Sequence, residues 1–280
     1  MATSRPARVL LLDGSPGATT VLLLAAHHVL DRIDHVLYAD TGLYPAASER
    51  YLKRVHGLSQ QAGAELIRAD ATGIAERAWS EHPCPLPLFT LDRDGRAGRL
   101  PNACSGAQLL ALTDHLRKWS KDQPHRKVEV VLDLGAEYAS RVPPQATWPS
   151  WVRFDYPLFH LGWGEQDCFA FNHHHGVGMR GLACLGCPER SDAEWAELRE
   201  SDPCAWEEAV ALDTAVRHHT TEAAASGMPP AETGYLHSSC RPLGGTELLP
   251  EQEGPVPGCL PRACRGGQRD TTSAGQGGRR

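Results

Sequence analysis

The sequence predicts an α/β fold in which a Rossmann-like, doubly wound, mostly parallel sheet is followed by a helical C-terminal part. Three observations lead to this prediction. Short apolar runs alternate with segments of helical length in the N-terminal part of the chain. A loop rich in Gly, Pro and Thr follows the first apolar run. Polar residues close the later runs at their carboxyl ends, where open parallel sheets bind ligands.

Each predicted element has its own signal. Leu52, Val55 and Leu58 recur at the spacing of one helix face. Ser191 and Glu194 stand three residues apart, as in the capping box that begins a helix. The predicted strands are 8–12, 35–39, 64–68 and 128–134, and the predicted helices are 20–30, 45–62, 105–118, 191–200 and 203–221.

Size, charge and cysteine usage narrow the class of protein. A chain of 280 residues can bury a full core, and its net charge of −6 does not indicate a general nucleic-acid binder. No apolar run is long enough for a transmembrane helix, and turn residues interrupt the first one, unlike a secretory signal. We therefore expect a cytoplasmic protein whose paired cysteines bind metal or react, instead of forming structural disulfides.

The chain divides into three predicted parts. Residues 1–190 are expected to form a nucleotide-binding α/β domain, and residues 191–248 a helical segment packed on it. Residues 249–280 are rich in Gly, Pro, Gln and Arg, a composition typical of a disordered tail. Within the first part, residues 82–99 are predicted to be an irregular loop, because Pro, Gly and Arg interrupt them.

Cys184-Leu-Gly-Cys187-Pro188 is the strongest chemical signal in the sequence. Two thiolates separated by two residues can bind one metal ion or part of an iron–sulfur cluster, because a tight turn directs both sulfurs to the same side. Cys104 lies far upstream and is a candidate third ligand; the helix predicted after it would favour its thiolate through the helix dipole. The alternative is that these cysteines pack as small apolar side chains.

Residues 13–20, Asp-Gly-Ser-Pro-Gly-Ala-Thr-Thr, join the first predicted strand to the first predicted helix. Such a loop can present backbone N–H groups to phosphates at a helix N-terminus. It is neither a Walker loop nor a dinucleotide fingerprint, because it lacks Gly-Lys-Ser/Thr and GxGxxG. A plain strand-to-helix turn is the alternative. Segments 40–42 and 135–141 also follow predicted strands and are expected to converge with this loop on one cleft.

Two further groups of side chains have a chemical interpretation beside a structural one. His173, His174 and His175 suggest a metal site, but adjacent histidines cannot all face one ion, and a solvated loop is the alternative. Arg141 and Arg180 can bind phosphate or sulfate through their forked donors, or form surface ion pairs.

Seven short motifs occur in an order and spacing that match one known family. They are the loop 14–20, Asp40-Thr41-Gly42, Asn102-Ala103-Cys104, Gly135 to Arg141, Tyr156-Pro157-Leu158 with Gly162-Trp163 and Asp167-Cys168, Cys184 to Pro188 with Trp195, and Gly234-Tyr-Leu-His237 with Arg241-Pro-Leu243. In these motifs the chain resembles the phosphoadenosine phosphosulfate (PAPS) reductase-like proteins common in phages and actinobacteria. They are a branch of the adenine nucleotide alpha-hydrolase-like superfamily. The resemblance spans about residues 8–245.

The resemblance implies a Rossmann-like sheet whose first loop holds the phosphates of ATP or PAPS, with Mg²⁺ as a further candidate cofactor. The nucleotide-binding residues that it implies are Gly14, Ser15, Gly17, Thr19, Thr20, Asp40, Gly42 and Arg141. Sulfonucleotide reductases hold a [4Fe–4S] cluster with a cysteine pair and a later CxxC, and Cys104, Cys184 and Cys187 match three of those ligands. The fourth would be Cys168 or one of the histidines 173–175; otherwise the cluster is incomplete, replaced by zinc, or absent.

The first loop departs from the family pattern, which usually reads Ser-Gly-Gly-Lys-Asp-Ser-Thr. Gly17 and Ala18 stand where the family has Lys and Asp. The loop is therefore degenerate: it lacks the side chains that neutralise phosphate and organise metal, although its backbone N–H groups remain. This departure bears on catalysis more than on fold.

Three functions are compatible with these features. The first is an enzyme that binds ATP or PAPS in the sheet-end cleft and acts in sulfonucleotide reduction or sulfur transfer, with an adenine nucleotide and a protein thiol or other sulfur donor as partners. The second is a degenerate, non-catalytic nucleotide-binding protein. The third is a nucleic-acid sulfur-modification factor, which the acidic net charge does not support. All three functions stay open at this point, as do iron and zinc for the metal.

Overall fold

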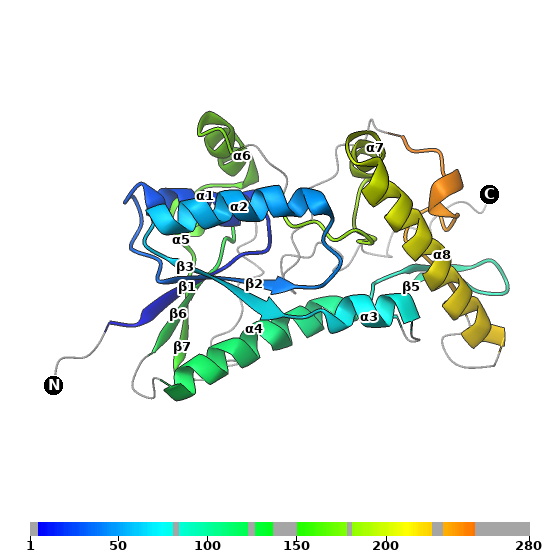
Figure 1. Ribbon diagram of the computed structural model, residues 1–280, viewed down its shortest axis with the longest axis horizontal. Coiled ribbons are helices and arrows are strands. Elements are labelled where there is room, and N and C mark those ends of the chain that lie inside the picture. The colour runs from blue at the N-terminus through cyan, green and yellow to red at the C-terminus, as the bar shows by residue number, and fades with distance from the viewer. Residues whose placement is uncertain are drawn as a thin grey trace, which may run out of the picture.

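The computed structural model describes residues 5–80, 84–122, 127–136, 150–177, 181–225 and 232–249 (Figure 1). At its centre lies a five-stranded parallel sheet with the strand order β3-β2-β1-β6-β7. The strands are β1 (Ala7–Leu11), β2 (His35–Asp40), β3 (Glu65–Asp70), β6 (Val128–Val131) and β7 (Val152–Asp155). The chain builds outwards from β1 to β3 and then returns to the other side of β1. The strand order therefore reverses between β1 and β6, the position at which such sheets bind ligands.

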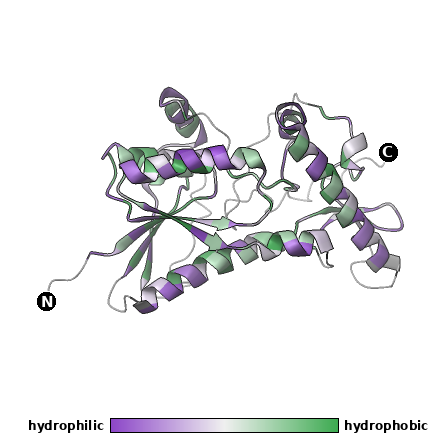
Figure 2. Cartoon of the chain, in the orientation of Figure 1, coloured by the Kyte–Doolittle hydropathy of each residue, from purple (hydrophilic) through white to green (hydrophobic). Residues whose placement is uncertain are grey.

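Helices cover both faces of the sheet (Figure 1). One face carries α1 (Pro16–Ala26) and α2 (Ala46–Gln61), with α5 (Pro157–Leu161) and α6 (Glu165–His174) beside α1, and the other carries α4 (Ala103–Asp122). Leu10 and Leu12 are buried in the layer of α1 and α2, and Val9 and Leu11 in the layer of α4. Because β1 is buried on both faces, its apolar residues run without alternation. Figure 2 shows hydrophobic residues concentrated in the strands between the helical layers.

A second lobe forms around a small antiparallel sheet with the order β5-β4-β8. Its elements are α3 (Gly73–Ser80), β4 (Phe89–Leu91), β5 (Ala97–Arg99), α7 (Asp192–Ser201), α8 (Pro203–Ala225), β8 (Thr233–Tyr235) and the 3-10 helix η3 (Leu243–Gly245). Trp195, Leu212 and Leu236 are fully buried in its core. Since β8 pairs with β4, the C-terminal segment shares a sheet with residues from the first half of the chain.

The predicted α/β class and the mostly parallel sheet are confirmed, with strand ends that differ by a few residues. The predicted capping box of α7 is also present, since the Ser191 and Glu194 side chains bond each other's backbone N–H groups. Helix α1 begins at Pro16, earlier than predicted. Ser15 caps it by accepting a hydrogen bond of 3.0 Å from Ala18 N, and proline at the first helical position already has a helical φ.

The prediction of an irregular loop over residues 82–99 is wrong, because β4 and β5 form a hairpin there. Asp92 Oδ1 accepts hydrogen bonds from the backbone N–H groups of Asp94 and Arg96 at 2.9 and 2.7 Å. Gly95 takes the left-handed conformation, with φ +77°, that this turn requires. Each strand has only three residues, too few to show the alternation by which a strand is recognised.

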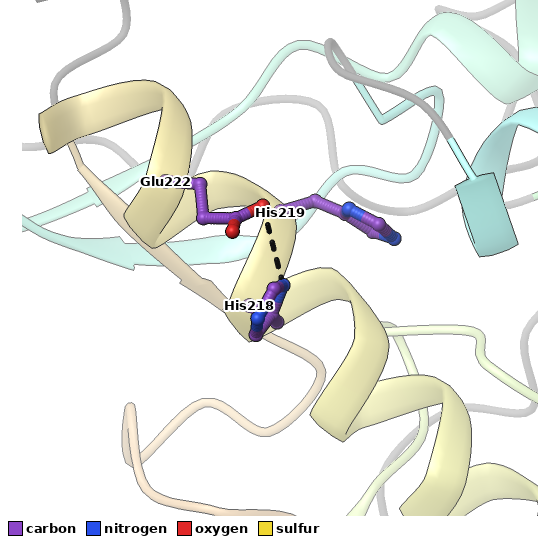
Figure 3. A group of neighbouring side chains, drawn as sticks. All are labelled: His218, His219 and Glu222. Carbon is purple, nitrogen blue, oxygen red and sulfur yellow. Dashed lines mark ion pairs between the residues drawn. The ribbon is translucent and has the colours of Figure 1, made fainter. Parts of the chain in front are cut away.

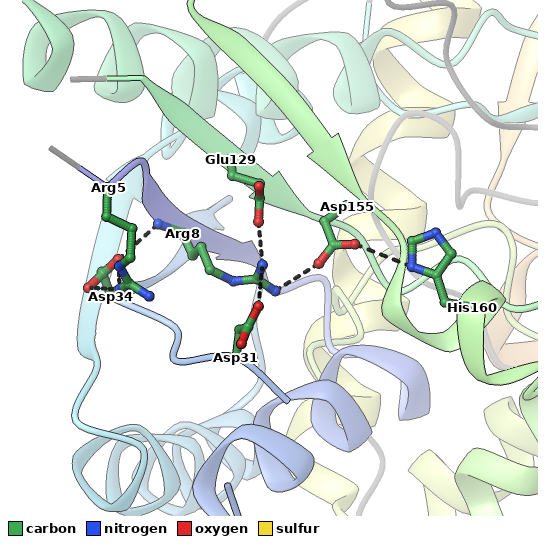
Figure 4. A network of polar contacts seen from close by, with 7 residues as sticks. All are labelled: Arg5, Arg8, Asp31, Asp34, Glu129, Asp155 and His160. Atoms are coloured by element: carbon green, nitrogen blue, oxygen red, sulfur yellow. Dashed lines mark hydrogen bonds and ion pairs between the residues drawn. The ribbon is translucent and has the colours of Figure 1, made fainter. Parts of the chain in front are cut away.

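An ionic network ties the central strand β1 to its neighbour β6 and to the edge strand β7 (Figure 4). The Arg8 guanidinium on β1 contacts Glu129 on β6, Asp155 on β7 at 2.7 Å and Asp31 at 3.7 Å. The Arg8 side chain is only 11% exposed, so these carboxylates compensate a charge that is largely removed from water. The network joins β1 to β6 and β7, the strands on the far side of the switch point.

The described helices include none that is both long enough and apolar enough to span a bilayer. The predicted disordered tail, residues 249–280, lies outside the described residues except for Leu249. The predicted boundaries of the α/β domain and of the helical segment stay predictions.

Candidate functional site

The CxxC segment crosses the carboxyl ends of the neighbouring strands β1 and β2. Gly181 and Leu182 pack directly on the backbone of Gly14, which follows β1. Further along the segment, Cys184 Sγ lies 3.2 Å from the hydroxyl of Thr41, which directly follows β2. The segment thus runs from the loop after β1 to the end of β2, and it connects the predicted phosphate loop to the predicted cysteine site.

Glycine is required on both sides of the first of these contacts. Gly14 has φ +83°, and a Cβ there would overlap the backbone N of Leu182. A Cβ at Gly181 would overlap the carbonyl of Gly14. Two stretches of backbone therefore approach each other without intervening side chains, which only paired glycines permit.

Cys104, Cys184 and Cys187 line one pocket. Cys184 and Cys187 are buried, at 6% and 8% exposure, and Cys104 is half-buried. The pocket has about 370 Å³ of space, including solvent at its mouth, and its other lining residues are Thr41, Ile74, Leu86, Pro87, Asn102, Gln108, Pro188 and Glu189. The structure thus brings a cysteine from the start of α4 together with the CxxC turn, as the sequence analysis expected of a shared site.

The backbone around the two motifs holds the cysteines in place. In the CxxC turn, Cys187 N donates to Cys184 O at 3.2 Å, and the Arg190 guanidinium donates to the same carbonyl. Cys104 is the second residue of α4. Asn102 precedes the helix, and its Oδ1 accepts hydrogen bonds of 3.1 Å from both Ser105 N and the Cys104 thiol. The positive end of the helix dipole therefore acts on Cys104 and favours its thiolate.

The three thiols suit a soft metal centre, because thiolates select zinc and iron–sulfur clusters over hard cations. Two sulfurs bound to one tetrahedral zinc lie about 3.8 Å apart, given Zn–S bonds of about 2.3 Å. Within the described ranges, the three sulfurs do not form a group in which every pair lies within 4.8 Å. A [4Fe–4S] cluster binds its cysteines on separate iron atoms and so holds them farther apart.

The other expected ligands lie elsewhere. Cys168 is buried on α6, in the core layer of α1 and α2, and it does not line the cysteine pocket. The histidines 173–175 end α6, where the His175 ring lies 4.8 Å from that of His27 at the far end of α1 from Ser15. Arg141 and Arg180 fall outside the described residues.

The N-terminus of α1 already holds a carboxylate of the protein. Asp133, which follows β6, accepts a hydrogen bond from the Ser15 hydroxyl. Gly17 lies so close that a Cβ on it would be 2.9 Å from both the carbonyl O and Oδ2 of Asp133. Acidic groups are favoured at this end of a helix, and the carboxyl group of Asp133 lies there, at the position that the sequence predicted for phosphate. Gly17 stands where the family that this loop resembles has lysine, and the carboxyl group of Asp133 lies directly beside it.

Asp133 and Asp13 form a pair of carboxyl groups at the switch point. Asp13 is buried, its Oδ1 accepts from Ser15 N at 2.8 Å, and its Oδ2 has no hydrogen-bond partner. Loss of hydration raises the pKa of both groups. The pKa of Asp133 rises to about 7, with repulsion from Asp13 as the second cause and hydrogen bonds from Ser15 and Ala18 opposing it. One proton shared by the pair, or a cation, would relieve the repulsion.

Thr19 and Thr20, which were predicted to bind a nucleotide, form hydrogen bonds within the protein. Thr19 Oγ1 lies 2.9 Å from the Tyr51 hydroxyl, and Thr20 Oγ1 lies 2.9 Å from both Pro16 O and Asn172 Oδ1. Both threonines are buried, on the side of α1 that packs on α2 and α6.

The strand-end motif after β2 is arranged differently. Asp40 forms an ion pair of 2.5 Å with Arg68 and accepts a hydrogen bond of 2.9 Å from Gly42 N. Gly42 adopts the left-handed conformation, with φ +73°. This turn places Thr41 in the wall of the cysteine pocket.

Sequence reasoning missed Asp133, Asn102 and Thr41 as site residues. Asn102 and Thr41 were part of recognised motifs, and their polar side chains next to a cysteine or a strand end were the available signal. Asp133 lay inside the predicted strand 128–134. Only the pairing of β1 with β6 brings it to Ser15.

Comparison with known proteins adds a distant structural likeness. Neither the protein-family models nor the curated proteins give a match to this sequence. Among solved structures, the U34-tRNA thiolase NcsA from Methanococcus maripaludis, with its [4Fe-4S] cluster, is similar at a TM-score of 0.42 and 10% identity. The similarity covers 91% of this chain and 78% of that one. A likeness at this level does not establish a family, an activity or a cofactor for this chain.

Gly14→Ala and Gly181→Ala are each expected to lower the free energy of unfolding by more than about 2 kcal/mol, because the added Cβ overlaps backbone that cannot move aside. Chemical denaturation measures this directly. Gly106→Ala is the matched control: it lies exposed in α4 with open space around it, and it should raise stability by up to about 1 kcal/mol. Wild-type stability in both site variants would contradict the close contact.

Asp133→Asn is expected to gain stability over the wild type as the pH rises. The pKa of Asp133 is raised from 3.8 to about 7 on folding. The folded state therefore binds the proton more tightly than the unfolded state, and this adds to the free energy of unfolding. The contribution is complete below about pH 4 and is lost as the pH rises through 7. The amide of the variant does not titrate, so its free energy of unfolding does not show this loss. Between pH 5 and pH 8 the free energy of unfolding of the variant should therefore rise relative to that of the wild type by about 1–4 kcal/mol, measured by urea unfolding. Asp114→Asn, which changes an exposed side chain of α4, is the control; a D133N difference that stays constant with pH would refute the raised pKa.

Proposed function

We propose that this chain binds a [4Fe–4S] cluster, or a zinc ion, through Cys104, Cys184 and Cys187 and acts in sulfur chemistry, either sulfonucleotide reduction or sulfur transfer. One observation carries the proposal. Three thiols from two distant segments line a single pocket beside the ligand-binding edge of a parallel sheet. Packing alone would not require a cysteine at each of the three positions, whereas a soft metal centre does.

The residues around the thiols have roles suited to such a centre. Metal binding requires deprotonated cysteines, and the start of α4 lowers the cost of a thiolate at Cys104. The Thr41 hydroxyl can donate to the sulfur of Cys184, the kind of hydrogen bond that tunes metal-bound sulfur. Ile74, Leu86 and Pro87 reduce contact with water. A bound cluster would supply electron transfer or a binding site for sulfur, and a bound zinc would activate a thiolate.

The substrate is proposed to carry an adenine nucleotide, as ATP or PAPS, placed over the carboxyl ends of β1 and β2. Asp133 and Asp13 would repel its phosphates unless a cation lies between them. Mg²⁺ takes one or two carboxylates together with phosphate oxygens, and Asp13 Oδ2 is a buried acceptor without a hydrogen-bond partner. Mg²⁺ held by these two carboxylates would thus replace the charge that the family's lysine provides. A protein thiol or another sulfur donor would complete the reaction.

A second candidate is a non-catalytic protein that has kept the fold and lost the phosphate site. The observation in its favour is that Asp133 occupies the helix N-terminus where phosphate would bind. ATP and PAPS titrations of the wild type and of Asp133→Asn, with and without Mg²⁺, separate the two candidates. The first predicts binding that needs Mg²⁺ and is weakened at least 10-fold in the variant. Binding to neither protein, or binding that improves in the variant without Mg²⁺, favours the second.

The proposed centre predicts bound metal in anaerobically purified protein. About four irons per chain with broad absorbance near 400 nm would identify a cluster, and about one zinc a zinc site. Cys184→Ser, Cys187→Ser and Cys104→Ser should each lower the metal content and, for a cluster, bleach the absorbance.

Cys204→Ser is the matched control, because Cys204 is exposed on α8 and does not line the pocket. Its metal content should equal that of the wild type. A wild type without metal, or a C184S variant that keeps the metal of the wild type, would contradict the proposal.

A further inference from the structure

Three side chains of types that can bind metal lie close together on α8, outside the cysteine pocket. His218, His219 and Glu222 each offer one ligand atom, and these atoms all lie within 4.8 Å of one another (Figure 3). Within the described ranges, no other set of three His, Cys, Asp or Glu side chains meets this spacing. The cluster is independent of the proposed sulfur chemistry, because none of its members lines the cysteine pocket.

The spacing of the exposed pair suits a shared ion. His218 Nδ1 lies 3.3 Å from Glu222 Oε2, one helical turn further along α8. Two ligands bound to a tetrahedral zinc at about 2.0–2.1 Å are about 3.3–3.4 Å apart. Both side chains are 66% exposed, so an ion reaches them directly from solvent.

His219 is oriented by a neighbouring helix. Its Nε2 lies 2.9 Å from the carbonyl oxygen of Trp79 in α3. A carbonyl only accepts hydrogen bonds, so this nitrogen carries the proton and donates it. In the neutral ring, Nδ1 then keeps its lone pair for another ligand. Most metal-binding histidines are held in this way, with the second ring nitrogen donating to a backbone carbonyl or a carboxylate.

A surface ion pair between His218 and Glu222 is the simpler interpretation of the same pair. It would contribute only about 0.3–0.5 kcal/mol, as exposed pairs on one helix do. It does not account for the third side chain, since His219 contributes nothing to that ion pair and yet offers a ligand atom within 4.8 Å of those of the other two.

We propose that His218, His219 and Glu222 bind a divalent transition-metal ion of the zinc class on α8, with the Trp79 carbonyl orienting His219. Two imidazoles and a carboxylate are a donor set that zinc accepts readily. The fourth position is left to water. Because His219 also contacts α3, the bound ion would fix the link between α8 and α3, two helices of the lobe that contains the CxxC turn. Ion binding to the folded state alone would then stabilise that lobe.

Zinc binding by the full chain tests this proposal. Isothermal titration with ZnSO₄ should show that His218→Ala and Glu222→Gln each weaken one site at least 10-fold, and zinc counted after dialysis should fall by about one per chain. Both substituted side chains are exposed, so neither variant is expected to unfold. His56→Ala, an exposed histidine of α2, is the matched control and should bind zinc as the wild type does.

This zinc comparison does not depend on the cysteine site, because the cysteines are the same in the wild type and in both variants. Loss of one zinc from H218A and E222Q supports the α8 site whether or not the cysteines hold metal. The same zinc count and affinity in these variants as in the wild type would overturn the proposal and leave only the ion pair.

Discussion

The contact between Gly14 and residues 181–182 determines where the rest of the candidate site lies. It is a contact of backbone on backbone, and neither Gly14 nor Gly181 has room for a side chain there. Once 181–182 is held against the loop after β1, the next few residues must pass over the end of β2, where Cys184 meets Thr41 and Leu185 N donates to Leu43 O. The CxxC turn is thereby fixed opposite the start of α4, and Cys104 completes the pocket.

The carboxyl ends of the strands have two electrostatically different halves. At the switch point, Asp13 and Asp133 place two carboxyl groups beside the N-terminus of α1, which favours a proton or a cation there. Beside β2, three thiols line a pocket with both apolar and polar walls, and one of them, Cys104, lies at a helix N-terminus; thiols are ligands that soft metals prefer. A phosphate group therefore needs a cation as an intermediary in the first half, whereas a soft metal centre suits the second half directly.

The sequence predicted the parts of this structure that local patterns encode. The alternation of apolar runs and helices predicted the parallel sheet, and the Ser191–Glu194 spacing predicted a helix start to the residue. The proximity of Cys104 to the CxxC turn was expected from the family resemblance, and the structure places them in one pocket. What escaped prediction depends on strand order and long-range packing. Asp133 becomes a site residue only because β6 lies beside β1, and Cys168 lies in another core layer because α6 packs on α1.

X-ray absorption at the metal edge of anaerobically purified protein tests the central claim most directly, because it reports which atoms surround the metal. The account predicts an iron or zinc environment with sulfur neighbours at about 2.3 Å, of which Cys104, Cys184 and Cys187 supply three. For a cluster, iron–iron scattering should accompany them. A metal surrounded only by nitrogen and oxygen, or protein that binds neither metal, would show that these cysteines are packing residues and would contradict the account.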